Sequence, residues 1–302
     1  MKPLPAFPDM EPLEIEHKPV IDALLHKLQP ETSELTFTNL YIWRHPYGLQ
    51  VTELDGAVCL LALRADPEDS FLLPPLGEAA GVAQVRTCLE WMADNEHNPR
   101  LWRIGEAAIA RLGLSADEFS IEPDRDNWDY VYRVRDLVDL PEVRYQDKVR
   151  HINQFTRKFR PEYHRITPDL VQACQDLQDL WCDAKHCDLY SSLHAEARAV
   201  KEALSNLDAL GITGGCLMVR GRVQAFALGE PLNNSTVVIH IEKASPDLHG
   251  AFQAINQQFL EHEWQGFEYV NREQDVGEPG LRTAKESYHP AKMVEKYVVR
   301  LA

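Results

Sequence analysis

The sequence has few cysteines and no long apolar segment. Six of its 302 residues are cysteine, and their spacing is irregular. Cysteines used in this way are typical of small core residues rather than of a disulfide framework, and they favour a reducing compartment. No apolar run approaches the roughly 18 residues that a membrane-spanning helix requires. We therefore expect a soluble protein whose core is held by hydrophobic packing.

The chain also has no recognisable export signal and no excess of positive charge. Prolines at 3, 5 and 8 interrupt the region where a signal peptide needs an apolar core of about 7 to 15 residues, which predicts a cytoplasmic protein. The formal net charge is -16. Long-range repulsion therefore disfavours broad adhesion to nucleic acid or to an anionic membrane, although local basic patches can still bind.

One cluster of soft ligands raises the question of a metal. Cys182, His186 and Cys187 are spaced so that their side chains could lie close together on a helix. A structural zinc site usually takes four ligands in two pairs, and the sequence offers no second pair. We expect no metal site.

The first half of the chain predicts a mixed α/β order. Helical spacing over 16–28 precedes an aromatic segment, 36–43, that we expect in the core. Asp55-Gly56 is a strong hairpin signal between two β-type runs, 48–54 and 57–63. The pattern then predicts a strand at 71–73, a helix at 82–95, a strand at 101–104, a helix at 107–112, and strands at 119–121 and 130–134.

The second half repeats this order after an expected linker at 136–141. Its predicted elements are a basic amphipathic helix at 146–160, helices at 169–185 and 195–207, a hairpin of 215–219 and 223–228, a strand at 237–242, a helix at 250–261, a strand at 268–271, a helix at 280–288 and a strand at 293–301. We interpret the shared order as an internal duplication and divide the chain into domains 1–140 and 141–302. The predicted fold class is α/β (α+β), with a mixed central sheet flanked by helices in each domain.

The order of elements resembles the GNAT acyltransferase fold, above all where the strand at 237–242 opens through a turn into a helix. Several segments also resemble a bacterial family related to the C-terminal domain of phosphatidylglycerol lysyltransferase. They are Thr36-Phe37-Thr38-Asn39-Leu40-Tyr41-Ile42-Trp43, Ala225-Phe226-Ala227-Leu228-Gly229-Glu230, His240-Ile241-Glu242-Lys243-Ala244, Ile255-Asn256 and the stretch from Tyr269 to Pro290. The resemblance covers nearly the whole chain and implies two tandem GNAT-like domains.

The resemblance implies a transferase. The lysyltransferases move an amino acid from aminoacyl-tRNA to a lipid, and GNAT enzymes move acyl groups from acyl-CoA. We expect an acyltransferase that moves an aminoacyl group from aminoacyl-tRNA, or an acyl group from acyl-CoA, to an amine of a soluble small molecule or peptide. Either donor would act as a substrate, and we expect no tightly bound cofactor. The alternative is a catalytically silent module that binds a small molecule or peptide on the same fold.

Transfer to an amine requires a base, donors for the developing oxyanion and an acid for the leaving group. The GNAT resemblance places a general base at Glu242, and strand alternation sends His240 to the same side. Tyr288 matches in register the tyrosine with which GNAT enzymes protonate the leaving thiolate. We take Glu242, His240 and Tyr288 as catalytic candidates. Pairing of Glu242 with Lys243 or Arg272, and simple packing of Tyr288, are the alternatives.

The remaining candidates lie around the loop at 271–280 and on two helices. Arg272 and Arg282 could bind a carboxylate or phosphate, and Glu273 and Asp275 could bind an amine, unless these residues form a self-satisfied ion network. The predicted substrate-binding residues are Asn271, Arg272, Glu273, Asp275, Arg282 and Lys285. Resemblance to the acyl-CoA position of GNAT enzymes implies donor contacts from Lys243, His249, Gly250 and Asn256. The basic helix could contact a tRNA backbone or a nucleotide phosphate through Lys148, Arg150, Arg157 and Lys158, unless it is only a solvated face.

Overall fold

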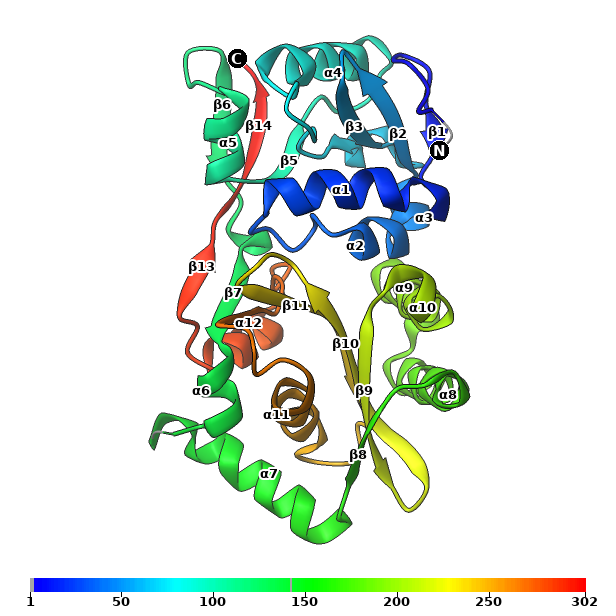
Figure 1. Cartoon of the computed structure of the whole chain (residues 1–302), viewed down its shortest axis with the longest axis vertical. Helices are drawn as coiled ribbons and strands as arrows, with labels where there is room; N and C mark the ends of the chain where they lie inside the picture. Colours follow the sequence, from blue (N-terminus) through cyan, green and yellow to red (C-terminus); the bar gives the residue numbers. More distant parts are fainter. Residues whose placement is uncertain (1–2, 142) are drawn as a thin grey trace. The chain divides into compact units, whose positions relative to one another are not determined.

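The computed structural model describes residues 3–141 and 143–302 and divides into two compact units. The first unit comprises the chain up to Asp129 together with Gln274–Arg282 and Met293–Ala302. The second comprises Tyr130–Glu273 and Thr283–Lys292. Within the described residues, each unit is built on a sheet of seven strands with helices against it (Figure 1).

The first unit contains most of the elements predicted for the first half. Its helices are α1 (Lys18–Leu28), α2 (Phe37–Ile42), α3 (Arg44–Tyr47), α4 (Val82–Asp94) and α5 (Glu106–Leu112), with 3-10 turns η1 (Ile15–His17), η2 (Pro67–Asp69) and η3 (Arg125–Asn127). Its strands are β1 (Glu11–Pro12), β2 (Leu49–Leu54), β3 (Ala57–Ala62), β4 (Phe71–Leu72), β5 (Leu101–Gly105), β6 (Phe119–Pro123) and β14 (Lys296–Leu301).

Local sequence signals explain two features of this unit. Asp55 and Gly56 both adopt positive φ, at 49° and 84°, as the tight turn between β2 and β3 requires. The aromatic segment at 36–43 forms α2, whose N-terminus is capped by the Thr36 hydroxyl accepting from the Asn39 amide. Every residue of α2 is buried, which confirms that this segment belongs to the core.

The second unit places helices on both faces of its sheet. Its helices are α6 (Val134–Asp139), α7 (Gln146–Phe159), α8 (Pro168–Lys185), α9 (Ser191–Ser205), α10 (Leu207–Leu210) and α11 (Ala251–Glu263), with 3-10 turns η4 (Val143–Tyr145) and η5 (Cys187–Leu189); α12 (Pro279–Glu286) begins in the first unit and ends in the second. The strands of its sheet are β7 (Asp129–Arg133), β8 (Glu162–Arg165), β9 (Thr213–Val219), β10 (Arg222–Pro231), β11 (Thr236–Ala244), β12 (Tyr269–Asn271) and β13 (Lys292–Val294), of which β7 begins and β13 ends in residues of the first unit. Helices α8 and α9 cover one face, and α11 with α7 lies on the other (Figure 1).

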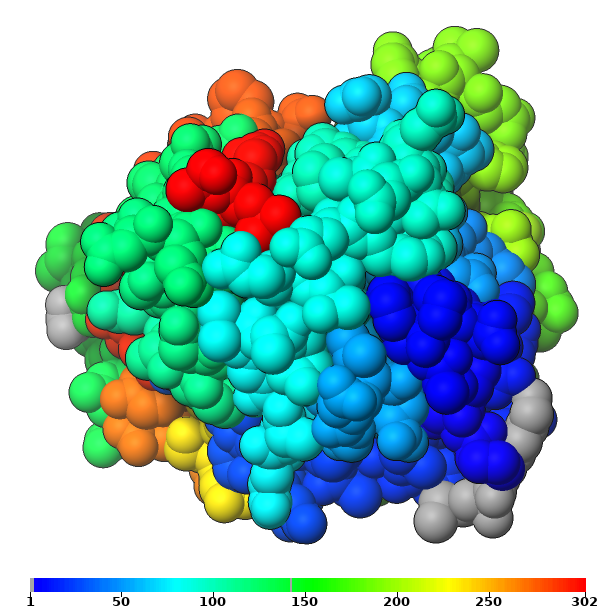
Figure 2. All heavy atoms as spheres, turned by 90° about the horizontal axis from the view of Figure 1, so that it is seen from above, coloured from blue at the N-terminus to red at the C-terminus, as the bar shows by residue number. Residues whose placement is uncertain are grey.

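The two sheets have the same strand order, which supports the internal duplication. The first runs β1-β2-β3-β4-β5-β14-β6, and the second, read from its other edge, runs β8-β9-β10-β11-β12-β7-β13. In each sheet the fourth and fifth strands are parallel. The sixth strand comes from the other half of the sequence: β14 pairs with β5, and β7 pairs with β12. Figure 2 shows the red C-terminal residues among the green and cyan atoms of the first unit.

This exchange of strands separates the units differently from the boundary expected at 140/141. The reset of pattern at 136–141 does not mark a linker over its first residues, because 136–139 complete α6. Val134 and Leu137 of α6 are buried, and the helix packs against α11. The linker interpretation is wrong for these residues, since buried apolar side chains hold them in place.

The cysteines also depart from expectation. Cys182 and Cys187 form a disulfide, whereas Cys59, Cys88, Cys174 and Cys216 are buried free thiols. Helix α8 ends at Lys185, and His186 adopts a left-handed conformation with φ 55°. That turn brings the Cα atoms of Cys182 and Cys187 to 5.0 Å, within disulfide range. The expectation of unpaired cysteines throughout is therefore wrong at this pair.

Two features are absent from the part of the chain that the structure describes. No helix there is long and apolar enough to cross a membrane. Among the same residues, no group of three or more His, Cys, Asp or Glu side chains is placed to hold a metal ion.

Candidate active site

Glu242 lies near the end of β11 and is held through both carboxylate oxygens. Asn256 of α11 donates from Nδ2 to Oε1 at 2.7 Å. Arg272, which follows β12, donates from Nη2 to Oε2 at 2.5 Å. The parallel pairing of β11 with β12 brings these residues together. Of the alternatives weighed for Glu242, the structure contains the ion pair with Arg272.

Arg272 is a largely buried cation with donor nitrogens to spare. Its side chain is 14% exposed, and its Nε and Nη1 atoms are buried without a hydrogen-bond partner. The guanidinium carbon lies 4.9 Å from the ring centroid of Tyr288 and 5.7 Å from that of Tyr132. Burial acts to lower the pKa of Arg272, but Glu242 and the two neighbouring tyrosines together outweigh burial and raise that pKa. Unsatisfied buried donors are costly, at about 1–3 kcal/mol each, so this arrangement favours a ligand with oxygen acceptors.

Tyr288 adds a neutral hydroxyl to the same place. Its side chain is buried, and burial raises its pKa to about 12, against the opposing effect of Arg272. Within the part of the chain that the structure describes, the hydroxyl makes no hydrogen bond to protein. Lys148 of α7 lies 4.4 Å from the Tyr288 ring centroid and donates to the Ser287 hydroxyl at 2.6 Å. Burial and the charge of Arg272 lower the pKa of Lys148.

These residues form a cluster, which we call the Arg272 cluster: Lys148, Tyr132, Glu242, Asn256, Arg272 and Tyr288. Its charges are two cations and one carboxylate, so one positive charge is in excess. Unpaired guanidinium donors can bind a developing oxyanion, and a neutral phenol can supply a proton. The chemistry available is therefore stabilisation of an anionic oxygen beside a proton donor.

His240 occupies an irregular position in β11. Leu228 of β10 pairs with Ile241 and Gly229 with Ile239, so His240 is the extra residue of a bulge. Its Nδ1 lies 2.8 Å from Glu273 and its Nε2 lies 3.0 Å from Glu230, and the side chain is 1% exposed. Burial acts to lower the pKa of His240, but the two carboxylates outweigh it and raise the pKa to about 9. Both ring nitrogens are thus engaged, and its catalytic role stays a prediction.

The segment that carries Arg272 is fixed by its neighbours. The Asn271 side chain accepts from the Glu273 amide at 2.8 Å. Lys285 of α12 donates to the backbone carbonyls of Arg272 and Glu273. Asn271 and Lys285, predicted to bind substrate, therefore hold the backbone around Arg272 in the structure.

Asp275 and Arg282 belong to the first unit, where they form an ion network. Asp275 is fully buried and accepts from Arg282 Nε and Nη2, both at 2.9 Å, and from Arg125 at 3.2 Å. Arg282 also donates to Asp126 at 2.7 Å. This is the ion network that the sequence offered as an alternative to substrate binding at this loop.

The predicted donor-binding residues do not gather in one place. Lys243 contacts α8 and α9, where its Nζ donates to Glu196 at 2.7 Å. Gly250 is the N-cap residue of α11, with φ 91°, and a Cβ there would lie 2.4 Å from the His151 carbonyl oxygen of α7. The exposed His249 has its ring centroid 4.3 Å from that of His151. Helix α7 thus lies against the N-cap of α11, where the resemblance to GNAT enzymes implies a pyrophosphate site.

The basic helix contributes one residue to the Arg272 cluster, which is Lys148. Arg150 is exposed and pairs with Asp147 at 3.0 Å. Arg157 and Lys158 are exposed at the end of α7. Contact of these residues with nucleic acid stays a prediction.

Tyr132 is the member of the cluster that the sequence did not reveal. Its hydroxyl donates to the Lys285 carbonyl at 2.8 Å, and its ring lies edge-on to Tyr288 at 6.4 Å. Tyr132 comes from β7, which the sequence assigned to the first domain. No local signal marks it, because only the exchange of strands brings β7 beside β12.

Comparison with known proteins shows the family to which the chain belongs. The family model described as "Phosphatidylglycerol lysyltransferase, C-terminal" matches residues 25–300. The chain belongs to this family. This membership, together with the matching strand orders, identifies both units as GNAT-like domains in tandem.

Solved structures extend the family comparison. A conserved protein of unknown function from Bacteroides thetaiotaomicron is 33% identical, with 97% of this chain and 99% of that chain covered and a TM-score of 0.87. The structure of L-PGS from Bacillus licheniformis is 12% identical, with coverage of 99% and 94% and a TM-score of 0.64. FemX is 9% identical, with coverage of 97% of both chains and a TM-score of 0.56, and shares the fold. Among curated proteins, none matches significantly.

Proposed function

We propose that this lysyltransferase-family protein transfers an aminoacyl group from aminoacyl-tRNA to an amine. The observation that carries the proposal is the pair of buried, unpaired donors, Nε and Nη1 of Arg272, beside the neutral hydroxyl of Tyr288. An ester carbonyl placed there would receive hydrogen bonds as its oxygen becomes negative. The family match supports the same class of reaction.

In the proposed reaction, the acceptor amine attacks the ester carbonyl carbon and a C–N bond forms. The carbonyl oxygen becomes an oxyanion that accepts from Arg272. The ester C–O bond then breaks, and Tyr288 gives its proton to the leaving ribose oxygen. The phenolate recovers a proton from the new ammonium group, so atoms and charge balance. Glu242 holds Arg272 in position, because both of its oxygens are already engaged.

The donor is proposed to be aminoacyl-tRNA rather than acyl-CoA. GNAT enzymes bind CoA pyrophosphate at a helix N-terminus, where free amides and the helix dipole attract it. At that position, α7 lies against Gly250, whose hydrogen faces the His151 carbonyl. The acceptor is proposed to be the soluble amine expected from the sequence.

The test compares donors and acceptors directly. The purified chain is incubated with tRNA charged with labelled amino acids, or with acetyl-CoA, in the presence of a panel of soluble amines or of phosphatidylglycerol vesicles. We expect tRNA-dependent label in a soluble amine product, which Arg272→Lys and Tyr288→Phe diminish and the exposed control Lys201→Ala does not.

Other outcomes would contradict specific parts of this proposal. Consumption of acetyl-CoA alone would overturn the donor, and labelled lipid would overturn the acceptor. A ligand that raises the melting temperature without any turnover would instead favour the silent binding module.

A further inference from the structure

The disulfide of the second unit faces a cavity. Cys182 at the end of α8 and Cys187 in η5 both line a hollow of about 620 Å³ between α8, η5 and α9. Charged side chains of both signs surround it, including Asp179, Arg198, Lys201 and Glu202. Small-molecule sites commonly enclose about 300–1,000 Å³, so a small polar molecule can reach the bond.

The other four cysteines are free thiols that are shielded from solvent. Cys59 and Cys88, and likewise Cys174 and Cys216, form two pairs of thiols with no exposed surface. The hydrogen bond from Cys59, together with burial, raises the pKa of the Cys88 thiol, and Cys216 and burial do the same for Cys174. Thiolates are the reactive species in exchange, so Cys88 and Cys174 resist it. The hydrogen bond from Cys174 lowers the pKa of Cys216, but neither Cys216 nor Cys59 has surface exposed to an attacking thiol.

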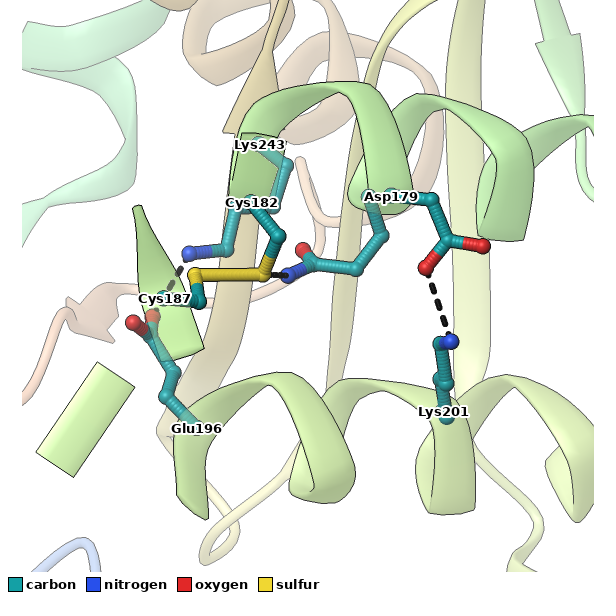
Figure 3. Close-up of a disulfide and its surroundings, with 7 residues drawn as sticks. Asp179, Cys182, Cys187, Glu196, Lys201 and Lys243 are labelled. Carbon is teal, nitrogen blue, oxygen red and sulfur yellow. Dashed lines mark hydrogen bonds and ion pairs between the residues drawn. A yellow bond between two sulfur atoms is a disulfide. The ribbon is translucent and has the colours of Figure 1, made fainter. Parts of the chain in front are cut away.

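The disulfide also lies next to two residues that enclose the buried Lys243, namely Trp181 and Glu196, which we call the Lys243 clamp. Lys243 is 5% exposed, and its ammonium nitrogen lies 3.6 Å from the ring centroid of Trp181, the residue before Cys182. The same nitrogen donates to Glu196 of α9 at 2.7 Å. Figure 3 shows Lys243 and Glu196 meeting beside the sulfur atoms. Because η5 packs against both α8 and α9, the bond ties together the two helices that enclose Lys243.

We propose that Cys182–Cys187 is a thiol–disulfide exchange site for low-molecular-weight thiols, and that its redox state controls the enclosure of Lys243. A thiolate entering the cavity attacks Cys182 Sγ, and the Cys182–Cys187 bond breaks as Cys187 leaves and takes up a proton. A second thiolate attacks the mixed disulfide and releases Cys182. Two small thiols are oxidised to their disulfide, and the protein disulfide is reduced to two thiols.

The redox state of the disulfide also affects β11, the strand that carries both Lys243 and Glu242. Lys243 and Glu242 are neighbours on β11 and point to opposite faces, Lys243 to α8 and α9 and Glu242 to α11. A buried ammonium requires its partner, so opening the clamp exposes Lys243 to solvent. The inference is independent of the proposed transfer activity, because it concerns sulfur chemistry on the other face of the sheet.

The test uses the folded chain in buffers of reduced and oxidised glutathione. Differential alkylation with peptide mass spectrometry measures each thiol, and acetylation with an amine-reactive ester measures each lysine. On reduction we expect Cys182 and Cys187 alone to become labelled and Lys243 to be acetylated about tenfold faster or more, because a short loop loses its covalent closure. Lys201, which pairs with Asp179 on the same helices (Figure 3), should keep its rate.

Variants separate exchange from simple loosening. In Cys187→Ser, we expect Cys182 to bind one glutathione as a mixed disulfide. Lys243 of this variant should be acetylated in every buffer at the rate measured for the reduced wild-type protein. If that variant does not fold, reduced wild-type protein supplies the same comparison. Resistance of the disulfide to glutathione until the protein unfolds, or equal acetylation of Lys243 in both redox states, would overturn the proposal.

Discussion

The ion pair between Arg272 and Glu242 determines which guanidinium nitrogens remain available to a ligand. Nη2 is committed to Glu242 Oε2 at 2.5 Å, whereas Nε and Nη1 are buried and unpaired. Asn256 fixes the other carboxylate oxygen. The pair therefore holds two donors in a defined direction beside Tyr288, which is how a preorganised oxyanion site is built.

Glu242→Gln keeps the shape of the side chain but removes its charge. We expect transfer to fall about ten- to a hundredfold, the equivalent of a charge-assisted hydrogen bond worth about 1.5–3 kcal/mol. The melting temperature should also fall, because Arg272 loses its counter-ion. Initial rates between pH 6 and 9 test whether Glu242 positions Arg272. If it does, its replacement lowers the rate by the same factor at every pH. Loss of a pH-dependent limb of the profile would instead identify Glu242 as the base.

Tyr288→Phe removes only a hydroxyl that bonds to no described protein group. Transfer should fall about 10²- to 10⁴-fold, the usual contribution of a general acid. Unfolding by urea should change by no more than about 0.5 kcal/mol, because the ring and its packing remain. A large loss of stability, or full activity, would remove Tyr288 from the reaction.

The charged triad of Glu230, His240 and Glu273 predicts a pH dependence of stability. The folded pKa of His240 is about 9, above the usual value of about 6.5. Its contribution, at most about 3 kcal/mol, is fully present below pH 6.5 and is lost as pH rises through 9. Melting temperatures should therefore fall more steeply from pH 6.5 to 9.5 in wild type than in His240→Gln. Parallel curves for the two proteins would show that the triad is not charged.

Lys296 is expected to be the most sensitive buried cation of the first unit. It has no exposed surface, and its Nζ lies 2.7 Å from both Glu34 and Asp129. Burial raises the pKa of Glu34 in spite of this partner. Lys296→Met would leave two buried carboxylates facing each other and should cost about 3–5 kcal/mol of stability. Chemical denaturation of Lys296→Met and of the exposed control Lys27→Met measures this loss of stability. Equal denaturation midpoints for the two variants would refute the estimate.

Local signals in the sequence were enough to place most elements. Asp55-Gly56 fixes a hairpin because both residues accept positive φ, and apolar residues three or four apart define α7. The prediction of a linker at 136–141 failed because α6, a short helix packed against α11, has too few residues to show a helical period of apolar side chains. The exchange of β7 and β14 depends on pairings across more than 130 residues, such as Tyr269 with Arg133, which no local pattern encodes.

The candidate site was also predictable only in part, because local signals mark single residues but not their partners. Glu242, Arg272 and Tyr288 were identified from strand position and family resemblance, and the structure brings them together. The partners of each side chain were not predictable, because they depend on packing: Asn256 holds Glu242, and Tyr132 arrives from another part of the sequence. The disulfide escaped prediction because it depends on the left-handed turn at His186.

The central claim is that the unpaired donors of Arg272 bind the aminoacyl carbonyl. The direct measurement is a crystal structure with a 3'-aminoacylamino-3'-deoxyadenosine, a stable amide analogue of the charged tRNA end, together with its affinity for wild type and Arg272→Met. We predict its carbonyl oxygen within hydrogen-bond distance of Arg272 Nε or Nη1 and a loss of affinity of about tenfold or more in the variant. A carbonyl bound elsewhere, with equal affinity for both proteins, would contradict the claim.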